Sequence, residues 1–233
     1  MIENFPTREA WAEAAAARLA GALAEALAAE GRALFAGSGG STPSPIYARL
    51  AQADLDWARV TATLVDERYV PEASPDSNAA LLKRALLTGP AAIARFIPLY
   101  SPAVTVDRAA ALASQALAAE SRPLDAVLLG MGEDGHICSM FPGSPTLTTL
   151  LTPGLKPAVY GVPTGRDGAA PPQERLTLNL PWLAEARCVV LALTGAKKRA
   201  VFEREAAGDP TVSPIAALIA ANTPLEVLWT EAG

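Results

Sequence analysis

The chain has 233 residues, of which 51% are hydrophobic and 18% are charged, and this composition argues against an intrinsically disordered protein. Lys and Arg number 19 against 24 Asp and Glu, so the formal net charge is −5. An acidic chain with a single His and no basic run is a poor candidate for sequence-independent nucleic-acid binding, which needs many phosphate-neutralising cations. We expect one domain over residues 1–233.

The cysteines and the N-terminus point to a cytoplasmic protein with no membrane partner. Cys138 and Cys188 cannot build a disulfide framework, and we expect both to be small buried side chains in apolar surroundings. The N-terminus lacks the basic stretch of a signal peptide, and no apolar run approaches the ~20 residues of a membrane span.

Helical and strand-like patterns alternate from the start of the chain. Large apolar residues spaced by multiples of four over 11–27 predict a helix, which Thr7 caps and Gly31 ends. A short apolar run at 33–36 predicts a strand. A glycine-rich segment follows, and Pro43 stands where the next helix begins.

The alternation continues to the C-terminus. Further helices are expected at 76–87, 107–120, 197–206 and from Ser213 onward. Further strands are expected at 60–65, 95–100, 125–129, 158–162, 187–194 and 225–229. Strands that alternate with helices predict an α/β fold, namely a doubly wound, mostly parallel sheet with helices on both faces.

Three of the expected strands end in polar segments of unusual composition. These segments are GSGGST after 33–36, DERYVP after 60–65 and GMGEDGH after 125–129. Ligands of doubly wound sheets bind beyond the carboxyl ends of the strands. We therefore expect the three segments to meet at one edge of the sheet, and residues 163–174 to form a loop over the site.

The first segment has the composition of an anion site. Glycines let the backbone turn tightly and present N–H groups, and the start of the following helix adds partial positive charge. Serine and threonine hydroxyls add donors. The candidate binding residues here are Ser38, Gly39, Gly40, Ser41 and Thr42. No Lys follows the last glycine, so the segment is not a Walker loop, and a simple tight turn is the alternative.

Charged residues in the second segment and further along the chain could complete a cationic pocket. Arg68 can bind a phosphate through two N–H groups, and Asp66 or Glu67 can orient it. Arg175 and one lysine of the TGAKK run would add positive charge, although each alone is a routine surface cation. The ligand that such a pocket suits is a small phosphorylated molecule.

The third segment contains His136, the only His of the chain, two residues after Asp134. Histidine exchanges protons near neutral pH, and a nearby carboxylate can fix its tautomer. The segment also contains G-x-G-x-x-G, but Glu133 and Asp134 would face a pyrophosphate with like charge, which disfavours dinucleotide binding. A single His excludes a zinc site with two or three His ligands, and a G-x-S-x-G elbow is absent.

Several motifs occur in the order found in 6-phosphogluconolactonases, and the chain resembles that family from about residue 6 to residue 230. The motifs are SGGSTP, DERYVP followed by SN, GMGEDGHICSMFPG, ERLTL and TGAKK. The pattern GxGxDGHxxSxFPG is the most specific of them, and the glycine segment is the least. Glucosamine-6-phosphate deaminases and sugar-phosphate isomerases share part of the pattern.

The resemblance implies a Rossmann-like fold and hydrolysis of 6-phospho-D-glucono-1,5-lactone to 6-phospho-D-gluconate, the second step of the oxidative pentose phosphate pathway. It implies no metal, no cofactor, and a monomer or small homo-oligomer whose partner is the sugar-phosphate lactone. His136 matches the catalytic histidine, with Asp134 beside it. The positions that match substrate and phosphate contacts are Ser38, Gly39, Gly40, Ser41, Thr42, Asp66, Arg68, Arg175 and Lys198.

Three alternatives stay open. A deaminase or isomerase of the same fold is the first, although the deaminases carry an Asn-Glu-Pro-like segment after the histidine where this chain has 140–143 (MFPG), which favours a lactonase. A sugar-phosphate-binding module without chemistry is the second, and the intact pair of Asp134 and His136 argues against it. A nicotinamide-dependent oxidoreductase is the third, and it rests on the glycines alone.

Overall fold

The computed structural model describes residues 2–40, 42–103, 105–164 and 172–232. Its main layer is a seven-stranded sheet in which every neighbouring pair is parallel. From one edge to the other its strands are β1 (Ile2–Phe5), β10 (Leu225–Thr230), β9 (Val189–Thr194), β6 (Ala126–Leu129), β2 (Ala33–Gly37), β3 (Val60–Leu64) and β5 (Arg95–Phe96). The predicted α/β class with a mostly parallel sheet is confirmed.

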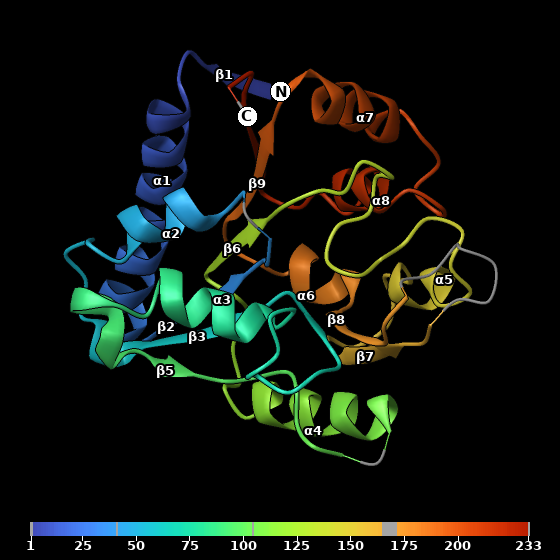
Figure 1. Cartoon of the computed structure of the whole chain (residues 1–233), viewed down its shortest axis with the longest axis horizontal. Coiled ribbons are helices and arrows are strands. Elements are labelled where there is room, and N and C mark those ends of the chain that lie inside the picture. The colour runs from blue at the N-terminus through green and yellow to red at the C-terminus, as the bar shows by residue number, and fades with distance from the viewer. Residues whose placement is uncertain (1, 41, 104, 165–171, 233) are drawn as a thin grey trace.

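Helices lie on both sides of this sheet, as Figure 1 shows. On one side α1 packs against the sheet and α2 and α3 follow it, while α6, α7 and α8 gather on the other side. The helices are α1 (Arg8–Glu30), α2 (Ser44–Leu50), α3 (Asn78–Ala85), α4 (Val106–Ala118), α5 (Leu147–Leu150), α6 (Leu180–Ala184), α7 (Ala196–Ala206) and α8 (Pro214–Ala220). None of the helices in the described residues is both long and apolar enough to span a membrane.

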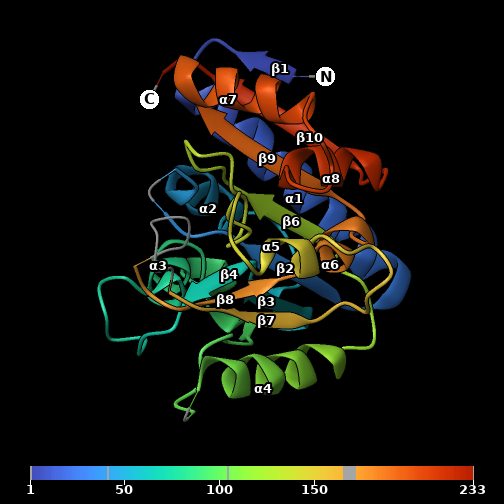
Figure 2. The same ribbon diagram turned by 90° about the vertical axis from the view of Figure 1, so that its right-hand side faces the viewer.

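A second, smaller sheet stands beside the first and was not expected from the sequence. Its strands are β4 (Asp66–Arg68), β8 (Arg175–Leu178) and β7 (Val159–Val162), and both pairings are antiparallel. Figure 2 shows α4 covering it from below. The sequence pattern predicted only β7, because β4 is three polar residues long and lacks the alternation that marks a half-buried strand.

Local signals explain where most elements begin and end. The Thr7 hydroxyl accepts a hydrogen bond from the N–H of Ala10, and Gly31 ends α1 in the left-handed region at φ 71°. Helix α3 begins at Asn78 rather than at residue 76, because Ser77 is its capping residue. Strand β5 is two residues long rather than six, since Pro98 cannot donate to a strand ladder.

The core lies between the main sheet and its helices. Strands β2, β3 and β6 are buried along their whole length, as the continuous apolar runs of a parallel sheet covered on both faces require. Three large side chains of α1 are fully buried in this core, namely Trp11, Leu19 and Leu23, whereas Leu27 is only partly buried. This core holds the carboxyl ends of the strands in place, and there the candidate site lies.

Candidate active site

The three polar strand ends meet in one pocket of about 270 Å³ at the carboxyl edge of the main sheet. The sequence-predicted residues that line it are Ser38, Gly39, Gly40, Thr42, Asp66, Arg68, His136, Arg175 and Lys198. Asp134 lies at its rim, in contact with His136. Ser41 and most of the expected loop 163–174 lie outside the described residues. The structure thus brings together the residues that the motifs singled out, while their roles remain predictions.

The glycine segment after β2 approaches the rest of the site too closely for side chains. A Cβ on Gly39 would lie 1.9 Å from Oδ1 of Asn78, and Gly40 has φ 87°, so glycine is required at both positions. The hydroxyl of Tyr47 donates to the carbonyl of Ser38 at 2.6 Å and fixes the start of the segment. The buried Oγ of Ser38 has no partner in the described part of the chain, which leaves it available to a ligand.

Glu67 in β4 is fully buried and organises the start of α3. Its carboxylate accepts hydrogen bonds from the main-chain N–H groups of Arg68, Asn78 and Ala79 at 2.7–2.8 Å and from the Ser77 hydroxyl at 3.1 Å. Burial raises the pKa of Glu67, and these hydrogen bonds oppose the rise. Its role is therefore structural.

Asp66, the neighbour of Glu67, points into the wall of the pocket. Its Oδ2 accepts a 2.6 Å hydrogen bond from the hydroxyl of Ser139, and its Oδ1 accepts one from Asn78 at 3.3 Å. Sequence reasoning did not assign either partner, although Ser139 stands in the GxGxDGHxxSxFPG pattern and Asn78 in the SN pair. Asp66 thereby ties β4 to the turn that follows His136.

Two arginines stand directly opposite each other where β4 pairs with β8. Arg68 and Arg175 are register partners, and the Nε of each is buried without a partner in the described residues. Burial, and next the charge of Arg68, lower the pKa of Arg175, while three nearby carboxylates oppose the effect. Two like charges held this way favour an anion between them.

The expectation that Asp66 or Glu67 orients the Arg68 guanidinium was wrong. The guanidinium donates instead to the main-chain carbonyl of Asp76 at 2.6 Å. The Asp76 carboxylate in turn accepts a hydrogen bond from the Gln173 side chain at 2.8 Å. The position of Arg68 therefore depends on the loop between β4 and α3, which a reading of neighbouring charges could not reveal.

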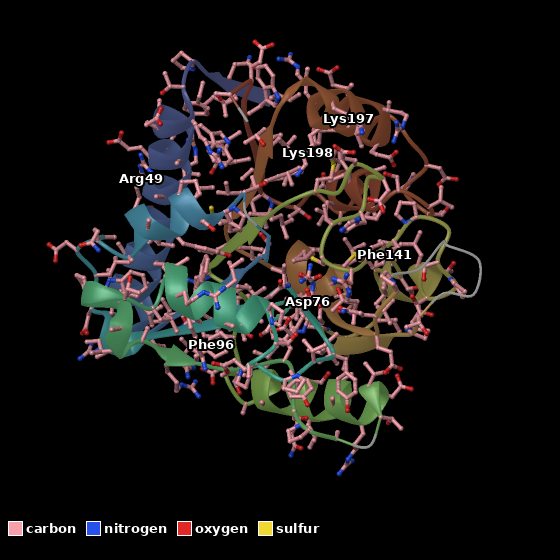
Figure 3. The ribbon with its side chains drawn as sticks, in the orientation of Figure 1. Arg49, Asp76, Phe96, Phe141, Lys197 and Lys198 are labelled. Atoms are coloured by element: carbon pink, nitrogen blue, oxygen red, sulfur yellow. The ribbon has the colours of Figure 1, made fainter. Side chains whose placement is uncertain are left out.

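The two lysines at the start of α7 differ in their surroundings, and Figure 3 labels both. Lys197 is exposed and pairs with Glu133. Lys198 is half-buried and lines the pocket, and no ion pair to it occurs among the described residues. Burial lowers the pKa of Lys198, and the charge of Glu133 opposes this. Of the two, Lys198 is the one placed to meet a ligand.

His136 is oriented by the carboxylate two residues before it. Its Nδ1 lies 2.5 Å from Oδ1 of Asp134, which also accepts the main-chain N–H of His136 at 3.2 Å. This contact holds the pKa of Asp134 below its ordinary value. A Cβ on Gly132 would lie 2.3 Å from Nδ1, so the turn needs glycine there. With its proton on Nδ1, the ring leaves Nε2 free to accept another.

Cys138 is buried as expected, but its surroundings are not simply apolar. It lines the pocket, and its backbone takes a positive φ of 53°. Burial and the negative charge of Asp66 raise the pKa of its thiol, which therefore stays protonated and is a poor nucleophile. Within the described ranges no cluster of three or more His, Cys, Asp or Glu side chains is arranged to hold a metal.

The chain is similar over its whole length to known proteins. Residues 6–229 match the family model described as glucosamine-6-phosphate isomerases/6-phosphogluconolactonase. The 6-phosphogluconolactonase of Rhizobium meliloti is 43% identical, with 97% of this chain and 96% of the relative covered. That of Caulobacter vibrioides is 41% identical, with 99% and 97% covered.

Solved structures agree with these similarities. A 6-phosphogluconolactonase from Shewanella baltica superposes with a TM-score of 0.89 at 33% identity, covering 99% of this chain and 97% of that one. A monomeric glucosamine-6-phosphate deaminase superposes with a TM-score of 0.75 at 17% identity, covering 98% and 96%. The second likeness extends to the fold alone.

Proposed function

The chain belongs to the glucosamine-6-phosphate isomerase/6-phosphogluconolactonase family, and on that basis we propose that it hydrolyses 6-phospho-D-glucono-1,5-lactone to 6-phospho-D-gluconate with His136 as the base. It is a hydrolase of a cyclic ester. One observation carries the assignment of roles: a single imidazole, oriented by Asp134, shares a pocket with three cationic side chains that have no carboxylate partner in the described residues.

In this mechanism the base activates a water molecule. A lactone is an activated ester, so hydroxide generated beside C1 suffices as the nucleophile. Nε2 of His136 takes a proton from water as the oxygen attacks C1, and the Asp134 carboxylate stabilises the resulting imidazolium. The carbonyl oxygen becomes an oxyanion, which N–H and O–H donors of the pocket stabilise.

The second half of the reaction returns the proton. The bond between C1 and the ring oxygen breaks, and the protonated His136 donates to that oxygen, which leaves as a hydroxyl of the open chain. The new carboxylic acid then ionises to the carboxylate in solution. The imidazole is neutral again, so no other proton donor is needed to complete the cycle.

The cations hold the remote end of the substrate. Arg68, Arg175 and Lys198 with the glycine segment bind the phosphate and the neighbouring hydroxyls. Such binding places C1 next to the base and the water, and the energy of the remote contacts supports the orientation of the reacting atoms. The half-buried positions of these side chains strengthen their attraction for a dianion.

A direct assay tests this proposal. Lactone hydrolysis is followed by acid release at near-neutral pH and corrected for spontaneous ring opening, on the wild type and on His136→Ala. We expect the wild type to turn over the lactone and His136→Ala to lose about 10²–10⁴-fold in kcat with little change in KM. An unchanged kcat would remove the histidine from its role, and a wild type without turnover would overturn the activity.

A control separates the nearest alternative. With glucosamine 6-phosphate as substrate we expect no ammonia above background, and rapid release would favour a deaminase. The proposed substrate is a sugar phosphate, which is too charged to cross a bilayer freely and therefore stays inside the cell. We therefore propose a cytoplasmic enzyme, acting as a monomer or a small homo-oligomer, whose assembly size gel filtration would measure.

A further inference from the structure

One aromatic ring, which packs against two residues of the pocket, has no role in the mechanism above. The ring centroid of Phe141 lies 4.5 Å from that of the His136 imidazole, with the two planes inclined by 39°. The guanidinium carbon of Arg175 lies over the same ring at 5.9 Å from its centroid. Phe141 therefore contacts the proposed base at a typical aromatic pair distance and the proposed phosphate anchor at the outer limit of a cation–π contact.

A tight turn brings this ring back onto the imidazole. The N–H of Met140 donates to the carbonyl of Ile137 at 3.0 Å, and Cys138 takes its positive φ within that turn. The turn is held to the rest of the site because the Ser139 hydroxyl donates to Asp66 at 2.6 Å and the Ser139 N–H donates to the Thr177 hydroxyl at 3.1 Å. A non-glycine residue at positive φ costs energy, and the surrounding contacts impose it.

We infer that Phe141 is a positioning residue for the reaction: its ring holds the His136 imidazole in place and stabilises it in the protonated state that follows proton transfer from water. The inference rests on the proposed function, since it concerns the imidazolium of that mechanism. An aromatic face carries partial negative charge and attracts a cation above it. The ring does not touch the reacting atoms, so it acts through the histidine.

The two contacts predict where the effect falls. The imidazole is the closer neighbour, and in the proposed mechanism it gains a proton as water attacks, so the ring contributes more to the transition state than to substrate binding. Arg175 is charged throughout and lies farther from the ring. Loss of the ring should therefore lower kcat more than it raises KM.

Substitution with a matched control tests the inference. Phe141→Leu is expected to lower kcat about 3- to 30-fold with KM changed less than about threefold, whereas Phe141→Tyr keeps the ring and retains kcat near the wild-type value. Phe96 offers the control: Lys83 lies 5.0 Å from the centroid of its ring, outside the pocket, and Figure 3 labels both phenylalanines. Phe96→Leu should leave kcat unchanged.

A second measurement does not depend on the fold of the Leu variant. Phenylalanines with one, two and three ring fluorines at position 141 weaken the negative face of the ring with little change in its size. We expect kcat to fall stepwise with each fluorine. An equal kcat across the series, or an effect on KM alone, would overturn the inference. A wild type that does not hydrolyse the lactone would instead overturn the proposed function.

Discussion

Among the described residues, charged side chains are paired at the amino ends of the main-sheet strands, whereas the cations that line the pocket at the carboxyl ends are unpaired. We call these two sides of the sheet its amino edge and its carboxyl edge. At the amino ends of the strands, Asp125 is fully buried and its carboxylate accepts hydrogen bonds at 2.7 Å from the N–H of Leu34 and from the Arg122 guanidinium. Arg187 pairs with Glu30 and lies 3.5 Å from the same Asp125. Each carboxylate of this cluster has a cationic partner.

At the carboxyl ends the arrangement is reversed. Arg68, Arg175 and Lys198 line the pocket, and none of them forms an ion pair among the described residues. Breaking a buried ion pair is costly because it strands a charge, whereas an unpaired cation in a pocket is stabilised only when an anion arrives. The first edge therefore stabilises the fold, and the second is available for binding.

The largest expected effect comes from breaking the ion pairs at the amino ends of the strands. Asp125→Ala leaves the N–H of Leu34 without its acceptor and removes the nearest anion from the buried Arg122 guanidinium, which keeps only the Arg32 carbonyl and Glu30 at 3.4 Å, so we expect the free energy of unfolding to fall by about 3–5 kcal/mol. Urea unfolding measures it. The surviving folded enzyme should keep its kcat. A decrease in the free energy of unfolding of less than about 1 kcal/mol would contradict the view that the charges at the amino ends of the strands stabilise the fold.

The matching change at the carboxyl ends of the strands should weaken substrate binding rather than the stability of the fold. Arg175→Ala removes one of the proposed phosphate-binding cations, so KM should rise about tenfold to a hundredfold. The free energy of unfolding should stay the same or rise, because the opposed charge of Arg68 is relieved. Steady-state kinetics and urea unfolding on one preparation give both values. A large drop in kcat at constant KM would count against phosphate anchoring.

The orienting carboxylate predicts an effect of intermediate size. Asp134→Asn weakens the hold on the correct tautomer of His136, and since the pair is partly exposed we expect kcat to fall only about tenfold at constant KM. Contact with His136 lowers the pKa of Asp134, so the ionised form is present at neutral pH and is lost only as pH falls through that lowered value. An Asn variant as active as the wild type would exclude this role.

The adjacent lysines allow the smallest and most closely matched test. Lys198→Ala should raise KM severalfold, which corresponds to about 1 kcal/mol of lost binding free energy. Lys197→Ala breaks only an exposed ion pair with Glu133, so the free energies of binding and of unfolding should each change by less than about 0.5 kcal/mol. Because burial lowers the pKa of Lys198, product binding should weaken toward alkaline pH, and Lys198→Arg should remove this dependence. Equal effects of the two Ala variants would refute the assignment.

Much of the fold and of the pocket followed from local patterns. Capping by Thr7 and Gly31, the apolar runs of β2, β3 and β6, and the polar segments after them are all readable over a few residues, because capping and burial act through near neighbours. The rule that ligands bind beyond the carboxyl ends of parallel strands then predicted that the polar segments lie close together.

Other features depend on contacts between distant segments. The pairing of β4 with β8 sets Arg68 opposite Arg175, and no periodicity in DER or ERLTL predicts it. The family resemblance pointed to Lys198, but its burial in the pocket and the exposure of Lys197 depend on how α7 packs against the sheet. The place of Phe141 depends on a turn that Asp66 anchors from a different strand.

The linear chain thus indicated which residues are candidates for the site and in what order most elements occur, since those properties are local. Which charges are paired, which stay open to a ligand and which ring rests on the imidazole were settled only when the sheets were assembled. The physical reason is that strand register and the burial of a charge are properties of the packed molecule, shared between segments far apart in sequence.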